Sequence, residues 1–275
     1  MKTIDHCLGR RIFSLPFAFC MSLLLGWSLS IPVHAESAEE KGLRIARDAD
    51  ARDHGFGNYT AQQTMVLRNK HGQESHRKLR VKILEVPEDG DKSLFVFDNP
   101  RDVQGTAFLV HSHKEGADDQ WLYLPALKRV KRISSSNRSG SFMGSEFAYE
   151  DMTAQDVDKF TYQYLRDEPC GDLTCFVVER IPTDKDSGYR RQLVWFDQEE
   201  LRAQQIHFYD RKDTHMKTLT LEEYAQYLDK FWRSGLMTMV NHVTGKSTTM
   251  MWKDYQFQTK LSDRDFTKTG LKRVR

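Results

Sequence analysis

The sequence is poor in cysteine and lacks the short motifs that mark common enzyme classes. It has four cysteines in 275 residues, and two of them, Cys7 and Cys20, lie in an N-terminal apolar segment. It contains no Gly-x-Ser-x-Gly elbow, phosphate-binding glycine loop or His-Glu-x-x-His motif. His111 and His113 alternate along one segment, but without a third fixed ligand they are better explained as solvated histidines than as a metal site. We therefore expect no enzyme, no metal and no other cofactor.

The sequence also lacks an excess of charge of either sign. It has 41 Lys and Arg against 39 Asp and Glu, a formal net charge of +2. Residues 1–35 hold three cations and one anion, so the rest of the chain has 38 charges of each sign. Proteins that bind nucleic acid through its phosphates need a cationic surface, so this balance argues against nucleic acid as a partner.

No apolar run is long enough for an ordinary membrane-spanning helix. The run from Ile12 to Trp27 contains Pro16 and is shorter than the roughly 20 residues that a span needs. Basic residues precede it, and a small-residue cleavage pattern ending at Ala35 follows it, as in a secretory signal. We predict a cleaved signal peptide at 1–35 and a single β domain at 36–275. Cys20 follows Phe19, which does not fit a lipid-modified cysteine.

The two remaining cysteines, Cys170 and Cys175, enclose a turn signal formed by Gly171 and Asp172. In an oxidising compartment two cysteines this close should form a disulfide. The bond would close the end of a hairpin and contribute about 2 kcal/mol through loop entropy. A redox-active pair is the alternative, although the spacing exceeds Cys-x-x-Cys and no helix start adjoins it.

The periodicity of the sequence predicts one helix followed by many strands. Residues from Ser37 to about Arg52 have helical spacing, with Ser37 as a possible cap to Glu40, and Gly55 and Gly57 end the segment. Later segments alternate with period two, which indicates strands with one buried face. The simplest topology is a mainly β, single antiparallel meander of about a dozen strands: Tyr59 to Leu67, Leu79 to Leu84, Leu94 to Phe97, Thr106 to His113, Trp121 to Leu124, Lys128 to Ile133, Phe160 to Leu165, Phe176 to Ile181, Gln192 to Phe196, Ala203 to Tyr209, Met216 to Tyr224, Leu236 to Val240 and Thr248 to Tyr255.

The strand from Lys128 to Ile133 carries the strongest charge cluster, formed by Lys128, Arg129, Lys131 and Arg132. It could contact anionic lipid headgroups or an acidic partner protein. The alternative is a solvated edge strand whose charges prevent pairing between sheets. Secretion and overall neutrality disfavour nucleic acid as its ligand.

A polar loop after this strand carries bulky apolar side chains. Ser134 to Ser141 is a Ser, Asn and Gly cluster that cannot pack a core, and Phe142, Met143 and Phe147 follow it. These apolar side chains need somewhere to pack. We expect them to act as a lid that occupies an empty cavity and is displaced by a ligand.

A twisted sheet of this size tends to curl, and its concave face must be covered or left hollow. Methionine and aromatic residues suit an adaptable apolar site, because thioethers repack at low cost. The same residues could equally fill an ordinary core. The candidates for the concave face are Trp121, Tyr123, Phe160, Tyr162, Tyr164, Trp195, Phe208, Met237, Met239, Met250 and Trp252.

Several stretches resemble the outer-membrane lipoprotein-sorting family, which includes the periplasmic carrier LolA and its receptor LolB. The match runs from about Lys41 to Lys272, and its most specific parts are Asn99 to Thr106, Trp121 to Ile133, Gly140 to Asp151 and Leu261 to Lys272. The resemblance implies an incomplete, strongly curved antiparallel β barrel, covered by a helix and a loop, with a cavity for acyl chains. It also implies a Gram-negative periplasm and a possible RND-type or MMPL-type transporter as partner.

The resemblance leads to a carrier hypothesis with one alternative. We expect a monomeric periplasmic carrier that binds the acyl chains of a lipoprotein or another lipid and shuttles them toward the outer membrane. The alternative is a sensor or adaptor that uses the same fold to contact a transporter or an envelope signalling protein. The chain lacks the lipidated cysteine of the LolB receptor, so a soluble shuttle fits better than an anchored receptor.

Overall fold

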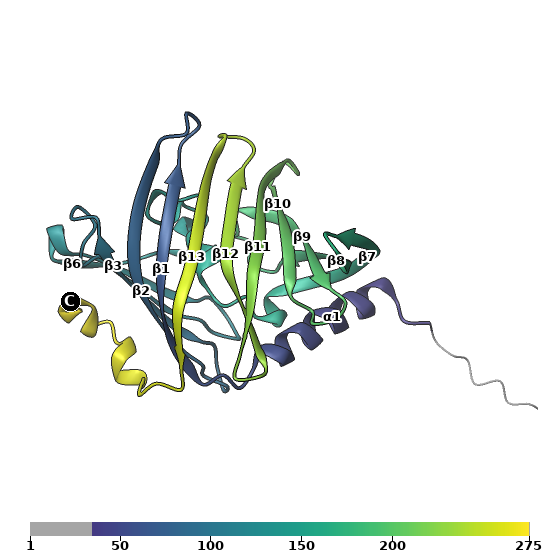
Figure 1. Cartoon of the computed structure of the whole chain (residues 1–275), viewed down its shortest axis with the longest axis horizontal. Coiled ribbons are helices and arrows are strands. Elements are labelled where there is room, and N and C mark those ends of the chain that lie inside the picture. The colour runs from purple at the N-terminus through teal and green to yellow at the C-terminus, as the bar shows by residue number, and fades with distance from the viewer. Residues whose placement is uncertain (1–34, 275) are drawn as a thin grey trace, which may run out of the picture. The chain divides into compact units, whose positions relative to one another are not determined.

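The computed structural model describes residues 35–274, which form one α-helix, thirteen β-strands and seven short 3-10 helices (Figure 1). The predicted signal peptide, apart from Ala35, lies outside the described residues. Helix α1 spans Ala38–Asp53 and begins as predicted. The Ser37 hydroxyl accepts from the Glu40 backbone N–H at 3.1 Å, and the Glu40 carboxylate accepts from the Ser37 N–H at 2.8 Å. This capping box satisfies two donors that a helix start would otherwise leave unpaired.

All thirteen strands belong to one antiparallel sheet, so the predicted fold class is confirmed. Each predicted alternating segment corresponds to a strand: β1 Asn58–Arg68, β2 Glu74–Leu84, β3 Lys92–Asn99, β4 Ala107–His111, β5 Asp119–Leu124, β6 Arg129–Arg132, β7 Phe160–Cys170, β8 Leu173–Pro182, β9 Tyr189–Asp197, β10 Ala203–Asp210, β11 His215–Tyr227, β12 Phe231–Asn241 and β13 Lys246–Phe257.

The strand order is β6-β5-β4-β3-β2-β1-β13-β12-β11-β10-β9-β8-β7. Strands β1 and β13, the first and last in the sequence, are therefore neighbours, and Met65 lies opposite Met250 in their register. The two edges of the sheet, β6 and β7, are consecutive in sequence and are separated by residues 133–159. The sheet bends strongly but stays open (Figure 1). Its opening thus coincides with the long loop that the sequence predicts.

The concave face of the sheet carries the largest apolar cluster. On β2, Leu79, Val81 and Ile83 share this face, as predicted from their alternation. The cluster crosses the sheet from β5 to β9, and residues of the long loop are part of it. The core of this fold is therefore completed by a segment outside the sheet.

The C-terminal tail covers part of the opposite, convex face. Its 3-10 helices η6 (Asp263–Phe266) and η7 (Gly270–Arg273) place Phe266 and Leu271 against Leu94, Val96 and Leu109. The predicted strand at Leu94 to Phe97 is apolar throughout because both of its faces are buried. Phe95 and Phe97 face the concave cluster.

Helix α1 packs against β7 at one edge of the sheet. Ile45 and Ala46 contact Tyr162 and Val178 in a separate apolar cluster. A Cβ atom at Gly42 would lie 2.7 Å from the backbone nitrogen of Tyr164, so only glycine lets the helix approach this closely. The helix therefore covers the β7 side of the opening.

Candidate functional site

Residues 134–152, which we call the plug, enter the hollow of the sheet from the opening between β6 and β7. Short 3-10 turns shape it, including η3 (Phe142–Gly144) and η4 (Tyr149–Met152), because its Ser, Asn and Gly residues favour turns over strands. Phe142 is 0% exposed and Phe147 is 4% exposed. The bulky residues of the predicted loop therefore do pack inside the curved sheet.

Phe142 lies at the centre of an aromatic cluster. Its ring centroid is 5.1 Å from that of Phe108, 6.0 Å from Phe97, 6.3 Å from Phe95 and 5.6 Å from Tyr149. Each such pair contributes about 0.5–1.5 kcal/mol beyond area burial. The plug thus replaces solvent over β3 and β4 with a packed aromatic contact.

Polar contacts fix the backbone of the plug to the sheet. The Glu146 N–H donates to Thr248 Oγ1 at 3.0 Å, and the Asn241 amide donates to Glu146 Oε2 at 2.7 Å. Gln120 Nε2 donates to the Tyr149 carbonyl at 3.0 Å. Arg77 donates to the Met143 carbonyl. Sequence reasoning missed these anchors, although polar residues at inward-facing strand positions, such as Gln120 and Thr248, were an available signal.

Two carboxylates join the end of the plug to β9 and the turn before it. Glu150 accepts from Ser187 Oγ at 2.6 Å and from the Gly188 N–H at 2.9 Å. Asp151 accepts from the Tyr189 hydroxyl at 2.9 Å. Burial raises the pKa of both Glu150 and Asp151 above their ordinary values. Desolvation therefore disfavours the charged forms of the two carboxylates that join the plug to the sheet. The hydrogen bond to Thr248 involves no charged group and has no such cost.

Two inward-facing glutamines have an oxygen without a partner among the described residues. Gln63 and Gln120 are 1% and 0% exposed, and their Oε1 atoms accept no hydrogen bond there. A buried acceptor left unpaired costs roughly 1–3 kcal/mol. Both oxygens could be satisfied by an N–H or O–H donor entering the hollow.

A cleft of about 300 Å³ lies between α1, residues 85–91 and residues 154–157. Phe56, Tyr162 and Phe196 are the aromatic residues of its lining, and Arg180 and several carboxylates are among its polar residues. This volume is at the lower end of the range for small-molecule sites. The α1 end of the concave face thus retains space that the plug does not fill.

The structure brings many of the predicted apolar residues together. Met237, Met239 and Trp252 pack in the concave cluster with Phe142, Met143 and Phe147 of the plug, and Phe208 and Met250 lie in the same cluster. Tyr162 and Tyr164 also lie on the inward face, where with Phe160 they pack against helix α1. The Lys41 Nζ atom lies over the Tyr164 ring, 3.4 Å from its centroid.

Three predicted residues lie on the other face of the sheet. Trp121 and Tyr123 pack against the C-terminal tail cluster, and Trp195 packs with Cys175 and Val177. Their placement on the concave face was wrong. The alternation shows that two residues share a face, but in strands that are apolar on both faces it does not show which face is concave.

The basic cluster lies on the edge strand β6 and the turn before it. Lys128, Arg129, Lys131 and Arg132 are all exposed. The register places Arg132 opposite Trp121 and Lys131 opposite Leu122, so the cations project from both faces of the strand. Arg132 pairs with Asp119.

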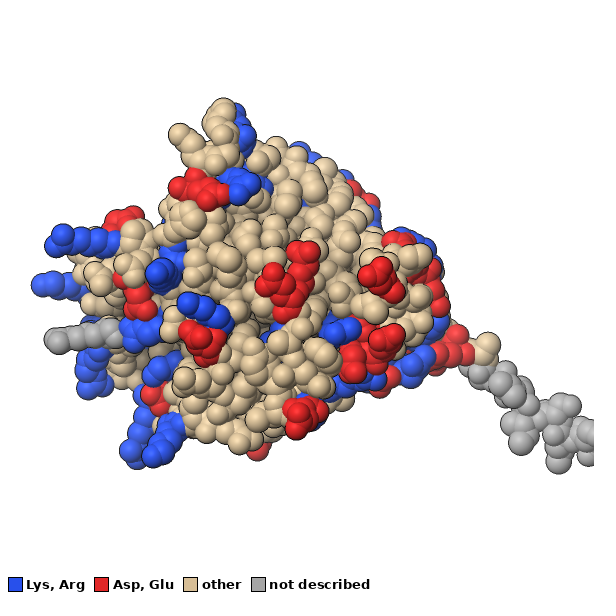
Figure 2. All heavy atoms as spheres, viewed as in Figure 1, with Lys and Arg blue, Asp and Glu red and all other residues tan. Residues whose placement is uncertain are grey.

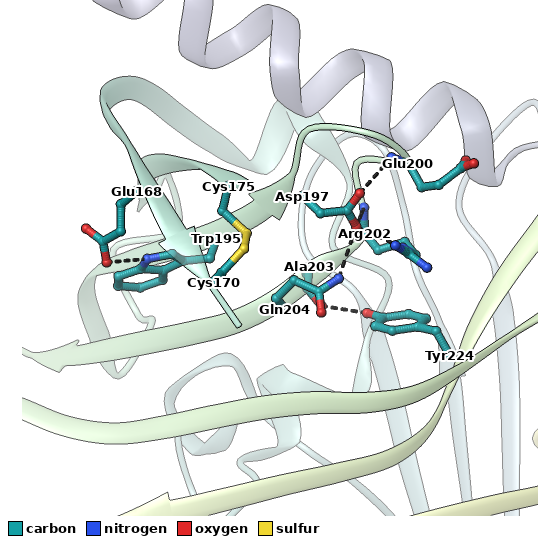
Figure 3. Close-up of a disulfide and its surroundings, with 10 residues drawn as sticks. All are labelled: Glu168, Cys170, Cys175, Trp195, Asp197, Glu200, Arg202, Ala203, Gln204 and Tyr224. Carbon is teal, nitrogen blue, oxygen red and sulfur yellow. Dashed lines mark hydrogen bonds and ion pairs between the residues drawn. A yellow bond between two sulfur atoms is a disulfide. The ribbon is translucent and has the colours of Figure 1, made fainter. Parts of the chain in front are cut away.

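Cys170 and Cys175 form the predicted disulfide, with their Cα atoms 5.9 Å apart. The bond joins the facing ends of β7 and β8, and Figure 3 shows it beside Trp195, whose indole donates to Glu168 at 2.9 Å. Asp197, on β9 with Trp195, accepts from Arg202 Nε at 2.8 Å (Figure 3). The surroundings are those of a structural disulfide at the rim of the sheet.

Comparison with known proteins identifies the family. A family model described as an uncharacterized protein matches residues 89–273. A domain from Vibrio parahaemolyticus described as an outer membrane lipoprotein-sorting protein is 56% identical, with a TM-score of 0.84, over 85% of this chain and 99% of that chain. This chain belongs to the outer membrane lipoprotein-sorting protein family. No curated protein matches it significantly.

Two further structures agree with this lipoprotein-sorting fold. A DUF1329 family protein from Desulfovibrio piger is 29% identical, with a TM-score of 0.81, over 86% of this chain and 99% of that chain. A LolA superfamily protein from Nitrosomonas europaea has the same coverage, with 20% identity and a TM-score of 0.67. The latter likeness shows the fold alone and confirms the predicted LolA-like architecture.

The 56% identical Vibrio domain is described as a lipoprotein-sorting protein and not as an enzyme, in agreement with the expectation from the sequence. Within residues 35–274, no helix is long and apolar enough to cross a membrane. The same residues contain no group of three or more His, Cys, Asp or Glu side chains that could hold a metal ion.

Proposed function

We propose that this lipoprotein-sorting protein is a periplasmic carrier that shields the acyl chains of a lipoprotein or another lipid in the hollow of its sheet. The observation that carries the proposal is the plug: a loop, and not a strand or helix of the scaffold, fills the apolar concave face. A ligand that displaced it would meet a ready-made apolar surface.

The energetics of acyl chains favour such a hollow. Exposure to water costs about 0.8 kcal/mol per methylene, so a chain of about 16 carbons would cost of order 10 kcal/mol in the periplasm unless it were shielded. Met237, Met239 and Trp252 would line the shielded path, and Tyr162 and Tyr164 would close it toward α1. The thioethers can repack around chains of different shape.

Release of cargo requires that the plug compete with the acyl chain. Phe142, Met143 and Phe147 occupy the surface that an acyl chain would use. Their return to the hollow offsets part of the free energy lost when lipid leaves, so binding stays reversible. In the resting state the plug also keeps this apolar surface out of water.

The remaining parts of the proposal concern partners and location. The carrier would act as a monomer in a Gram-negative periplasm, after cleavage of residues 1–35. It would receive lipid with the help of an inner-membrane transporter of the RND or MMPL type. The exposed cations on β6 and its preceding turn would face lipid headgroups or an acidic partner.

Native mass spectrometry of the full chain purified from a periplasmic extract tests the carrier proposal. We expect mass adducts of one lipid or one acylated peptide, which organic extraction identifies. Protein that is free of lipid, and that takes up no acylated peptide when incubated with it, would contradict the proposal. A protein that stays empty but copurifies with a stable protein partner would indicate an adaptor instead.

A further inference from the structure

One end of the molecule is strongly cationic although residues 36–275 are formally neutral. Figure 2 shows Lys and Arg side chains gathered at the end that carries β6 and the C-terminal tail. The cleft beside α1, in contrast, is lined by the carboxylates of Asp50, Asp53, Glu85, Asp89, Asp91 and Asp156. Charge is therefore segregated along the molecule, which gives it a preferred orientation in the field of a charged surface.

Two segments far apart in the sequence build this cationic end. Val130 of β6 packs in the same apolar cluster as Leu271 and Val274 of the tail. The contact holds η7 against the β5–β6 hairpin. It brings the exposed cations of both segments to one end of the molecule: Lys128, Arg129, Lys131, Lys268, Lys272 and Arg273.

Three acidic residues at this end are already paired. Asp119 pairs with Arg132, Asp263 with Lys92 and Asp265 with Lys82. Among the described residues, the six cations of the previous paragraph take part in no ion pair. Their charge remains available to a partner.

An apolar side chain stands at the tip of the same hairpin. Leu127 is 62% exposed, in the turn formed by η1 (Pro125–Leu127) between β5 and β6. An exposed leucine followed directly by the cations Lys128 and Arg129 matches the interface of a bilayer, where charges contact headgroups and an apolar side chain reaches the acyl boundary. An acidic protein would give the leucine a partner only if it also offered an apolar pocket.

We propose that this cationic end, formed by the β5–β6 hairpin and the C-terminal tail, docks on a membrane surface containing anionic phospholipid. The inference goes beyond the proposed function, because docking does not depend on whether the hollow binds lipid. Each Lys or Arg near an anionic surface contributes about 1 kcal/mol. Docking would present the opening beside β6 to the bilayer.

Vesicle cosedimentation of residues 36–275, the chain that remains after cleavage of the predicted signal peptide, tests this proposal. We expect binding to vesicles of phosphatidylglycerol mixed with phosphatidylcholine, no binding to phosphatidylcholine alone, and loss of binding at high salt. Two double variants, K128Q/K131Q and K272Q/R273Q, should each weaken binding roughly 30-fold, since each removes two cations. All four residues are exposed, so circular dichroism should show an intact fold.

Matched controls separate docking from general charge effects. Lys70, in the β1–β2 turn, and Lys246, the first residue of β13, are exposed cations of two neighbouring hairpins. Val243, 65% exposed, lies in the β12–β13 turn. The variant K70Q/K246Q should bind vesicles as the unchanged chain does. Leu127→Ser should weaken binding, whereas Leu228→Ser, at a position 47% exposed in another turn, should not.

Three outcomes would overturn the proposal. The first is equal binding to both vesicle types. The second is a loss of vesicle binding in K70Q/K246Q as large as that in the two test variants. The third is unchanged vesicle binding in the tail variant K272Q/R273Q. Binding to an acidic protein without binding to anionic vesicles would assign the surface to a protein partner and would also reject the membrane.

Discussion

The hydroxyl of Thr248 accepts a hydrogen bond from the backbone N–H of Glu146 at 3.0 Å and joins strand β13 to the plug. Thr248 is 0% exposed, so water cannot replace it as an acceptor. The contact is neutral, and it holds the plug backbone directly beside Phe147. It is therefore a point at which plug stability can be changed without altering charge.

Replacing Thr248 by Val should loosen the plug. Valine has nearly the same shape but no acceptor, so the part-buried Glu146 N–H would lose its partner at a cost of roughly 1–3 kcal/mol. We expect faster amide hydrogen exchange in residues 140–152 and faster uptake of a fluorescent fatty acid. Thr249→Val is the matched control, because Thr249 contacts Thr238 at 3.3 Å on the other face. Equal effects of the two variants on hydrogen exchange and on fatty acid uptake would contradict a role of Thr248 in holding the plug.

Replacing Phe142 by Ala should reveal how much the plug stabilises the fold. The side chain is fully buried among Phe95, Phe97 and Phe108, and such truncations cost about 3–5 kcal/mol. The same change leaves a cavity that a fatty acid could fill, so we expect added lipid to restore much of the lost stability. Urea unfolding with and without lipid measures both effects. An unchanged midpoint in lipid-free protein would show that the plug is not part of the core.

Replacing Gly42 by Ala should displace helix α1 from β7. The new Cβ would lie 2.7 Å from the Tyr164 nitrogen, which is backbone and cannot move aside as a side chain could. Although alanine favours helices, overpacking of this kind costs typically 1–3 kcal/mol. We expect a lower thermal midpoint, and the exposed position Glu39→Ala provides a control. A higher midpoint would mean that helix propensity outweighs the clash.

The contribution of His207 to stability should fall as the pH drops from about 6.5 to 4. Burial, and then the neighbouring His215 and His242, lower the pKa of His207 to about 4, whereas Glu168 acts in the opposite direction. The rings of His207 and His215 stack at 4.3 Å. The unfolded chain binds a proton below about pH 6.5 and the folded chain does not, so the stabilisation is complete above that pH and is lost below it. Thermal midpoints of His207→Gln should depend less on pH in this window than those of the unchanged chain or of His71→Gln.

The sequence predicted the elements well because their signals are local. The capping box at Ser37 and Glu40, and the alternation of Leu79, Val81 and Ile83, are visible without a structure. The disulfide followed from two close cysteines. Phe142 and Phe147 stood out because bulky apolar residues in a polar loop must pack somewhere.

The sequence could not show which face of a strand becomes concave. Trp121 and Tyr123 alternate with Leu122 and Leu124, and either pair could face the hollow. In the structure, Phe266 and Leu271 of the tail pack against Trp121 and Tyr123, so these two residues lie on the convex face. Such a contact joins residues more than a hundred positions apart and leaves no periodic signal.

The pairing of β1 with β13 has a consequence for biogenesis. The two halves of the sheet, β1 to β6 and β7 to β13, can each form from local hairpins. The β1–β13 pair that joins them forms only after β13 has been synthesised. The plug is synthesised before every strand of the second half. Until β13 pairs with β1, the phenylalanines of the plug have no complete apolar surface to pack against, so a chain that has not finished translation or export is prone to aggregate.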